Sequence, residues 1–112
     1  MDIISLREVF AVAKNVEYTA HCQKRMMERS ISRNDIKNCV MNGEIIEDYP
    51  LDVDNKSVKS FPSCLILGLK LNNKTVIHVV VGLNGDRVII ISAYYPDLEH
   101  WESDYRTRKR RE

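Results

Sequence analysis

Three side chains that carry or can carry positive charge recur at every fourth position of the segment 21–29. His21, Arg25 and Arg29 are spaced i, i+4 and i+8. On an α-helix, residues four apart lie on one face, roughly 5–6 Å apart. This cationic stripe would combine one titratable nitrogen with two permanent cations, which suits a phosphodiester or another anion. A solvated helix face would show the same spacing, so the spacing leaves both interpretations open.

His78 is the second candidate, because it interrupts an apolar run at residues 76–81. Strand alternation places it on the same face as Val76, Val80 and Gly82. A lone histidine in a strand is commonly a core residue with one hydrogen-bond partner, and its apolar neighbours should lower its pKa and keep it neutral. A neutral imidazole near a phosphate can also act as a base.

The hairpin turn after residue 83 determines which tyrosine shares the face of His78. A two-residue turn at Asn84-Gly85 would place Tyr95 on that face. A three-residue loop at 84–86 with a bulge would place Tyr94 there instead. A change of one residue in register exchanges the two faces, and the turn sequence does not decide between them.

The elements that must position these residues change in character along the chain. Apolar spacing predicts helices at 2–14, 20–29 and 33–41, with Thr19 as one N-cap and Ser32 with Asp35 as a capping box. A short strand is expected at 16–18, and further strands at 44–49, 65–71, 75–83 and 87–95. A polar loop is expected at 51–60. Helices followed by a meander predict an α+β domain with helices packed on an antiparallel sheet.

The second predicted helix can be divided into sides at about 100° per residue. Ala20, Cys22, Met26 and Met27 should form its broad buried side. The cationic stripe flanks that side, where its side chains would lie along the edge of the sheet.

Length and composition predict one globular domain. The chain has 112 residues, of which 44% are apolar, and this is ordinary for a globular protein. No apolar run could span a bilayer and no signal-peptide pattern is present, so we expect a cytoplasmic protein without a membrane partner. Three scattered cysteines and the absence of ligand clusters or nucleotide-binding motifs predict neither a metal site nor a cofactor.

The C-terminal residues are strongly basic. Residues 106–112 hold five basic side chains and one acid, whereas the whole chain has a net charge of +1. The basic residues could form an arm for the RNA backbone or a solubilising tail that contacts nothing. They are Arg106, Arg108, Lys109, Arg110 and Arg111. Just before them, Trp101 is expected to anchor the returning chain, and His100 shows no evident partner.

Several short motifs occur in an order that resembles a family of small bacterial proteins, domain of unknown function 4258. The resemblance runs from about residue 18 to 108. The motifs include Tyr18-Thr-Ala-His21, Arg25-Met-Met-Glu-Arg29, Asn42-Gly43-Glu44, Pro62-Ser63-Cys64, His78-Val-Val-Val and Ser92-Ala-Tyr94-Tyr-Pro96-Asp97, followed by Trp101 and Arg106.

This resemblance implies a fold similar to that of the RelE/ParE-like toxins, with N-terminal helices on a curved antiparallel sheet. Residues 1–15 would be an N-terminal helical extension, 16–105 the RelE-like domain and 106–112 the basic tail. The wider group includes metal-independent ribonucleases, and the family is suspected of belonging to toxin–antitoxin pairs. The resemblance also favours the bulged turn, since Tyr94 holds the motif position.

The leading hypothesis is therefore a toxin-like endoribonuclease that needs no metal. His21 or His78 would accept the proton of a ribose 2′-hydroxyl, and Arg25 and Arg29 would stabilise charge on the phosphate. Tyr94 or the other histidine would protonate the leaving 5′-oxygen. The expected partners are RNA and a cognate antitoxin protein.

The alternative hypothesis is a non-catalytic module of the same fold that binds a protein or a nucleic acid. In that case the cationic stripe would pair with an acidic partner or with the chain's own carboxylates, such as Glu44 or Glu47. Residues 106–111 would then be a docking arm.

Overall fold

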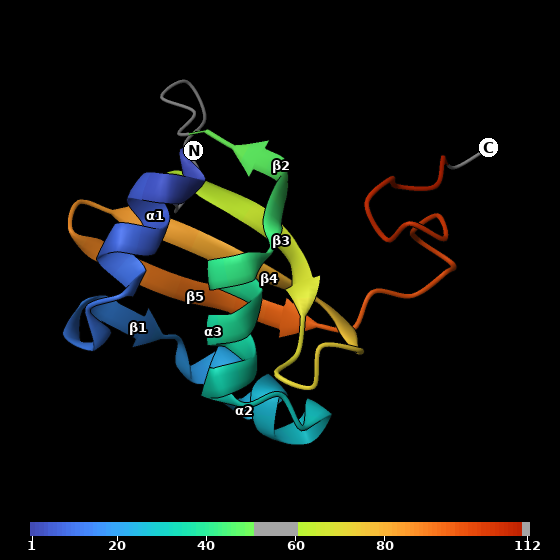
Figure 1. Ribbon diagram of the computed structural model, residues 1–112, viewed down its shortest axis with the longest axis horizontal. Helices are drawn as coiled ribbons and strands as arrows, with labels where there is room; N and C mark the ends of the chain where they lie inside the picture. Colours follow the sequence, from blue (N-terminus) through green and yellow to red (C-terminus); the bar gives the residue numbers. More distant parts are fainter. Residues whose placement is uncertain (51–60, 111–112) are drawn as a thin grey trace.

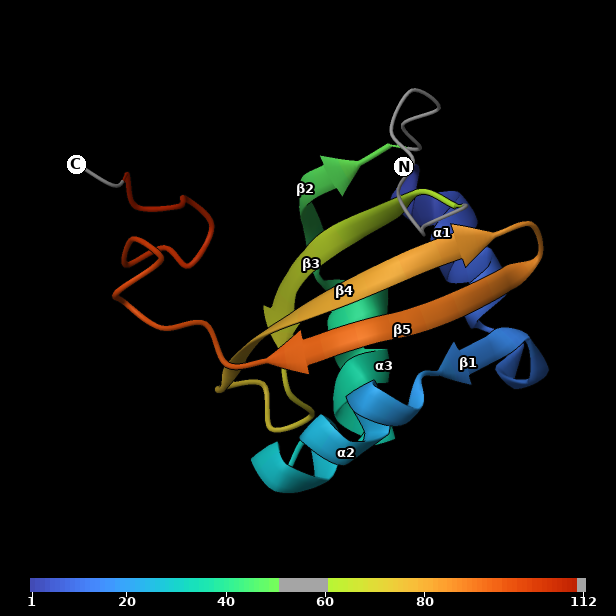
Figure 2. The same cartoon turned by 180° about the vertical axis from the view of Figure 1, so that it is seen from behind.

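A computed structural model describes residues 1–50 and 61–110 of the protein. It is an α+β fold in which α1 and α3 cover one face of a five-stranded sheet and α2 lies beside its lower edge (Figure 1). No helix of the described residues lies on the opposite face, and the C-terminal residues extend past one end of the sheet (Figure 2). The elements are α1 (Ile3–Phe10), a 3₁₀ turn (Ala13–Asn15), β1 (Val16–Tyr18), α2 (Ala20–Arg29), α3 (Arg33–Asn42), β2 (Glu44–Tyr49), β3 (Ser63–Leu69), β4 (Val76–Asn84) and β5 (Arg87–Tyr94).

Each helix begins at a side chain that accepts a backbone N–H. Asp2 caps α1, and Thr19 caps α2 by accepting from the Cys22 N–H at 3.0 Å. Ser32 and Asp35 form the predicted capping box of α3, with both reciprocal hydrogen bonds present. The two caps predicted from sequence, at Thr19 and Ser32, are confirmed.

The sheet is mixed, which corrects the expectation of a purely antiparallel one. Its strand order is β1-β5-β4-β3-β2. Strands β2 to β5 form the predicted antiparallel meander, but β1 joins the edge of the sheet parallel to β5. A strand of only three residues carries no signal for its direction, and here α2 follows it directly and continues along β5. The predicted loop at 51–60 lies outside the described residues.

One hydrophobic core lies between the helices and the sheet. It contains Leu6 and Phe10 of α1, Cys22 and Met26 of α2, and the alternate residues Ile77, Val79 and Val81 of β4 among others. Residues 1–15 therefore supply part of the central core. No helix within the described ranges is long and apolar enough to cross a membrane.

Leu6→Ala tests the contribution of α1 to this core. Leu6 is fully buried, and deletion of such a side chain costs about 2–5 kcal/mol through lost burial and the cavity left behind. We expect a decrease of that size in the free energy of unfolding, measured in urea. Ile4→Ala, at an exposed position of the same helix, is the matched control and should change stability by less than about 0.5 kcal/mol. Equal effects of the two variants would show that α1 is not part of the cooperative fold.

The β4–β5 hairpin differs from both turns considered for it. Asn84 pairs with Arg87, so the turn consists of Gly85 and Asp86, with Gly85 in the left-handed region at φ 62°. A bulge at Ile91 then shifts the register in the middle of β5, because Val81 faces Ile90 but Val80 faces Ser92. As a result His78 pairs with Tyr94. Tyr94 is the tyrosine on the face of His78, and a bulge inside the strand places it there.

Candidate active site

His78 lies on the sheet face opposite the helices and is completely buried. Its neighbours on β4, Ile77 and Val79, belong to the core under the helices, so alternation turns His78 to the other face. Its exposed fraction is 0%. The Trp101 ring covers it edge-to-face, with ring centroids 4.5 Å apart, and the Tyr94 ring contacts it with centroids 5.3 Å apart.

Both ring nitrogens of His78 have hydrogen-bond partners. Nε2 lies 2.7 Å from the carbonyl oxygen of Tyr105, and Nδ1 lies 3.2 Å from the hydroxyl of Tyr94. A carbonyl only accepts, so Nε2 carries the proton and donates it, while neutral Nδ1 accepts from the Tyr94 hydroxyl. In this arrangement His78 has no nitrogen free to take a proton from a substrate.

The environment of His78 makes stability depend on pH. Burial lowers the pKa of His78 below its ordinary value of 6.5, although the Tyr105 carbonyl and Glu47 partly oppose the shift. As pH falls below about 6.5 the unfolded chain therefore gains a proton that the folded protein does not, and the free energy of unfolding decreases.

His78→Gln should weaken this pH dependence, because the amide can replace both hydrogen bonds but does not titrate. The measurement is the free energy of unfolding of both proteins in urea from about pH 7.5 to 5.5. Glu47, whose pKa the Arg108 hydrogen bond lowers below 4.5, loses its contribution only at more acidic pH. Parallel curves for wild type and variant would contradict this assignment.

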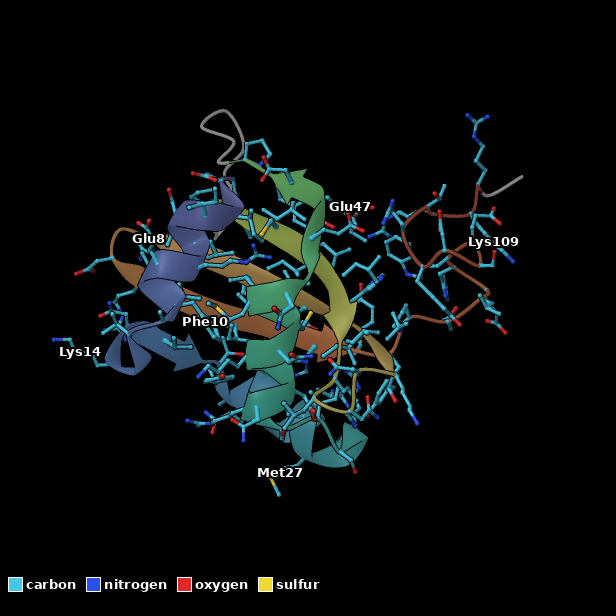
Figure 3. The ribbon with its side chains drawn as sticks, viewed as in Figure 1. Glu8, Phe10, Lys14, Met27, Glu47 and Lys109 are labelled. Atoms are coloured by element: carbon cyan, nitrogen blue, oxygen red, sulfur yellow. The ribbon has the colours of Figure 1, made fainter. Side chains whose placement is uncertain are left out.

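The residues that cover His78 belong to the C-terminal segment, residues 97–110. Arg108 forms two hydrogen bonds with the Glu47 carboxylate, at 2.6 and 2.9 Å, and its guanidinium lies 4.6 Å from the centre of the Trp101 ring. Arg106 pairs with Glu44. Figure 3 shows Glu47 at the side of β2 that faces the C-terminal segment. Trp101 is 3% exposed and anchors the segment as the sequence predicted.

These ion pairs correct the interpretation of residues 106–112 as a tail that contacts nothing. Two of the basic residues, Arg106 and Arg108, are neutralised by the acidic strand β2. Lys109 and Arg110 are exposed and form no ion pair within the described residues. Arg111 lies outside the described residues.

The cationic stripe lies on α2 and turns gradually toward the sheet. His21 is exposed, whereas Arg25 and Arg29 are half-buried. Four residues advance the helix by about 400°, so each step moves the stripe about 40° toward the buried side. The buried side is narrower than predicted: Cys22 and Met26 are buried, but Ala20 is exposed. Met27 is 84% exposed and projects away from the molecule (Figure 3).

The stripe makes its contacts within α2 and with β5. Arg25 forms an exposed ion pair with Glu28 at 2.9 Å, and Arg29 donates to the carbonyl oxygen of Ala93 at 2.8 Å. The stripe therefore does not pair with Glu44 or Glu47, one of the two pairings considered under the alternative hypothesis, because arginines of the C-terminal segment occupy both carboxylates.

Strand β5 brings Tyr94 to the same edge of the sheet as the stripe. Strand β1 pairs with β5 only as far as Ile90, where the Thr19 N–H bonds to the Ile90 carbonyl oxygen at 3.3 Å. Helix α2 then runs beside the remainder of β5, and Arg29 reaches Ala93, the residue before Tyr94. Tyr94 is half-buried and connects this edge to the buried His78.

Tyr95 and Lys70 form a contact that sequence reasoning missed. Tyr95 donates to the carbonyl oxygen of Arg29, and the Lys70 ammonium donates to the Ser30 carbonyl and the Tyr95 hydroxyl at 2.9 Å each. A cation is favourable at the C-terminal end of a helix. Adjacent strand residues point to opposite sides. Tyr94 therefore bonds to His78, whereas Tyr95 bonds to the last residue of α2.

One group of exposed side chains has metal-ligand character. The ligand atoms of Asp97, Glu99 and His100 lie within 4.8 Å of one another. His100 was expected to have no partner, but its Nδ1 lies 2.8 Å from the Asp97 carboxylate. The Asp97 carboxylate already bonds to the His100 ring and to the backbone N–H groups of Glu99 and His100, and we assign no metal to the group.

Comparison with known families identifies the family to which the central part of the chain belongs. The sequence model of the family described as Domain of unknown function (DUF4258) matches residues 18–95. The chain belongs to this family. No curated protein and no solved structure shows significant similarity to it. The match contains the cationic stripe, His78 and Tyr94, whereas Trp101, Tyr105 and Arg108, which cover His78, lie beyond it.

Proposed function

We propose that the protein is a metal-independent endoribonuclease of the toxin type, with its working surface where α2 runs beside β5. The observation that carries the proposal is a helix with an exposed imidazole and two guanidiniums on one stripe, whose last residue, Arg29, bonds to the Ala93 carbonyl next to Tyr94. These groups are of the types that serve as base, phosphate ligands and acid when the phosphoryl group of RNA is transferred to a ribose 2′-oxygen.

In the proposed reaction His21 accepts the proton of the 2′-hydroxyl while the 2′-oxygen attacks phosphorus. Arg25 and Arg29 stabilise the negative charge that develops on the phosphate oxygens. The exposed Arg25–Glu28 pair is worth less than about 1 kcal/mol, so a phosphate can replace Glu28.

Tyr94 protonates the 5′-oxygen as its bond to phosphorus breaks. Burial raises the pKa of Tyr94 above its ordinary value of 10, so the phenol keeps its proton at neutral pH. The hydroxyl turns from His78 to the leaving oxygen, and His78 is a positioning residue that holds the tyrosine. The products are a 2′,3′-cyclic phosphate and a 5′-hydroxyl.

The wider proposal follows the family resemblance: a RelE/ParE-like fold, a cytoplasmic location and a cognate antitoxin protein. The exposed cations Lys109 and Arg110 would contact the RNA backbone without reading its sequence. Expression in a bacterial host tests this proposal. Growth should stop with wild type and continue with Arg25→Ala, and co-expression of the antitoxin gene should restore growth with wild type.

The second candidate is a non-catalytic module that binds nucleic acid through the same stripe. The burial of His78 and the occupation of both its nitrogens favour this candidate, because His78 cannot then act as a base on a substrate. Of the two histidines considered as bases, this leaves His21. A binding module would retain RNA in EDTA without cutting it. Loss of that binding in Arg25→Ala, together with harmless expression of wild type, would support this candidate and exclude the toxin.

A further inference from the structure

A hollow lies on the helix side of the molecule, between the end of α1, strand β1 and the start of α3. Its volume is about 200 Å³. The apolar part of its lining includes Phe10, which is 6% exposed and is labelled at the end of α1 in Figure 3, together with Ala11 and Val16. Tyr18, Arg33, Asn34 and Lys37 complete the lining.

Two cations of this hollow have no acidic partner among the described residues. Arg33 and Lys37 lie four residues apart on α3, and neither forms an ion pair with any described residue. In contrast, Arg87, Arg106 and Arg108 are each paired with a carboxylate. The Arg33 guanidinium is held over the Tyr18 ring, 4.5 Å from its centre. Stacking leaves the edges of the guanidinium available for a carboxylate.

The edge of β1 beside the hollow offers backbone groups as well. The Thr19 N–H points to β5, and successive strand residues turn their backbone groups to alternate sides. Val16 and Tyr18 therefore turn theirs away from β5. The Tyr18 carbonyl is taken by the Gln23 side chain at 3.0 Å, and the 3₁₀ turn Ala13–Asn15 uses the Val16 N–H. Among the described residues, the Val16 C=O and the Tyr18 N–H therefore remain along this edge.

We propose that this hollow binds an extended segment of a partner protein in which a carboxylate neighbours an apolar side chain. The apolar side chain fills the space over Phe10 and Val16, and the carboxylate pairs with Arg33 and Lys37. The backbone of the segment bonds to the edge of β1. This inference does not depend on ribonuclease activity, because the hollow contains none of the residues assigned to that reaction.

A peptide fits the hollow better than a nucleic acid does. The volume of about 200 Å³ is below the range of roughly 300–1,000 Å³ typical of small-molecule pockets, but it accommodates one or two side chains. Phosphates would use Arg33 and Lys37 but leave the apolar lining and the backbone edge without partners. An extended peptide uses all three features, as in other complexes built on a sheet edge.

Amide NMR spectra of the full chain test the proposal. The probe is the peptide acetyl-Glu-Val-Glu-Leu-Glu-Val-amide, and its control has glutamine in place of each glutamate. A hexamer of uridylate tests for nucleic acid. We expect the acidic peptide to shift the amide signals of Val16, Tyr18 and Arg33 at up to millimolar concentration. Arg33→Gln with Lys37→Gln should weaken binding at least about tenfold, as loss of a charge-assisted contact implies.

Lys24→Gln with Lys74→Gln is the matched control, because it removes the same charge from exposed residues that do not line the hollow. It should bind the peptide as wild type does, and thermal melting should show that both double variants fold. Equal weakening in the two double variants would overturn the proposal, as would stronger binding of the uridylate at the same residues. Absence of any shift with the acidic peptide would overturn it too.

Discussion

Trp101→Ala should lower the free energy of unfolding by about 3–5 kcal/mol, the usual cost of removing a buried tryptophan side chain. Trp101 is 3% exposed and lies between His78 and the Arg108 guanidinium. Its removal should also give water access to His78, since the Trp101 ring packs edge-to-face on that imidazole, with ring centroids 4.5 Å apart.

The expected loss in the free energy of unfolding is larger for Trp101 than for the ion pairs around it. An exposed pair such as Arg106–Glu44 contributes about 0–1 kcal/mol, and a cation–π contact at an exposed site contributes about 0.5–1 kcal/mol. The buried aromatic ring is therefore the main energetic link between the C-terminal segment and the sheet. The arginines mainly fix its position.

Unfolding in urea is followed by far-ultraviolet circular dichroism and not by tryptophan fluorescence, because the substitution removes the only tryptophan of the sequence. Arg106→Gln is the control and should cost less than about 1 kcal/mol. A loss below about 1 kcal/mol for Trp101→Ala would show that the C-terminal segment is not part of the cooperative fold.

His21→Ala should reduce RNA cleavage by roughly 10²–10⁴-fold, the usual contribution of a positioned acid or base. The stability of the protein should not change, because His21 is exposed and its helix is capped by Thr19 rather than by the histidine. The rate is measured on a labelled RNA in EDTA, alongside thermal melting of both proteins.

His100→Ala is the matched control for this variant. His100 is also exposed, and its contact is with Asp97 in the C-terminal segment. It should cleave as wild type does. Equal rates for wild type, His21→Ala and His100→Ala would remove the cationic stripe from the mechanism.

Local sequence signals predicted the helices and most strands of this fold. The caps at Thr19 and Ser32 determine where α2 and α3 begin, and the observed α2 has the predicted bounds. Such signals act between residues close together in the chain. The direction of β1 depends on packing beyond its three residues, and its parallel pairing with β5 was not predictable from its pattern.

The sequence suggested candidate residues for the site but not their geometry. The bulge at Ile91, in a run of branched residues without glycine, shifts the register and pairs His78 with Tyr94. His78 is covered by residues that lie far along the chain from it, such as Trp101. Glu47 and Arg108 are 61 residues apart, and nothing in the charge pattern specifies that they pair.

The exposed position of Met27 has a similar explanation. Helical periodicity places it near the buried side, but in the structure only Cys22 and Met26 of α2 are buried. Periodicity gives the direction of a side chain and not the width of the surface that covers it.

Analysis of the RNA ends produced by wild type in EDTA tests the central claim most directly. The proposed reaction uses a 2′-hydroxyl and no metal ion, so we expect fragments ending in 2′,3′-cyclic phosphate, no cleavage of an RNA with 2′-O-methyl groups throughout, and little cleavage by Arg25→Ala. RNA that stays intact with wild type, or equal cleavage by wild type and Arg25→Ala, would contradict this account.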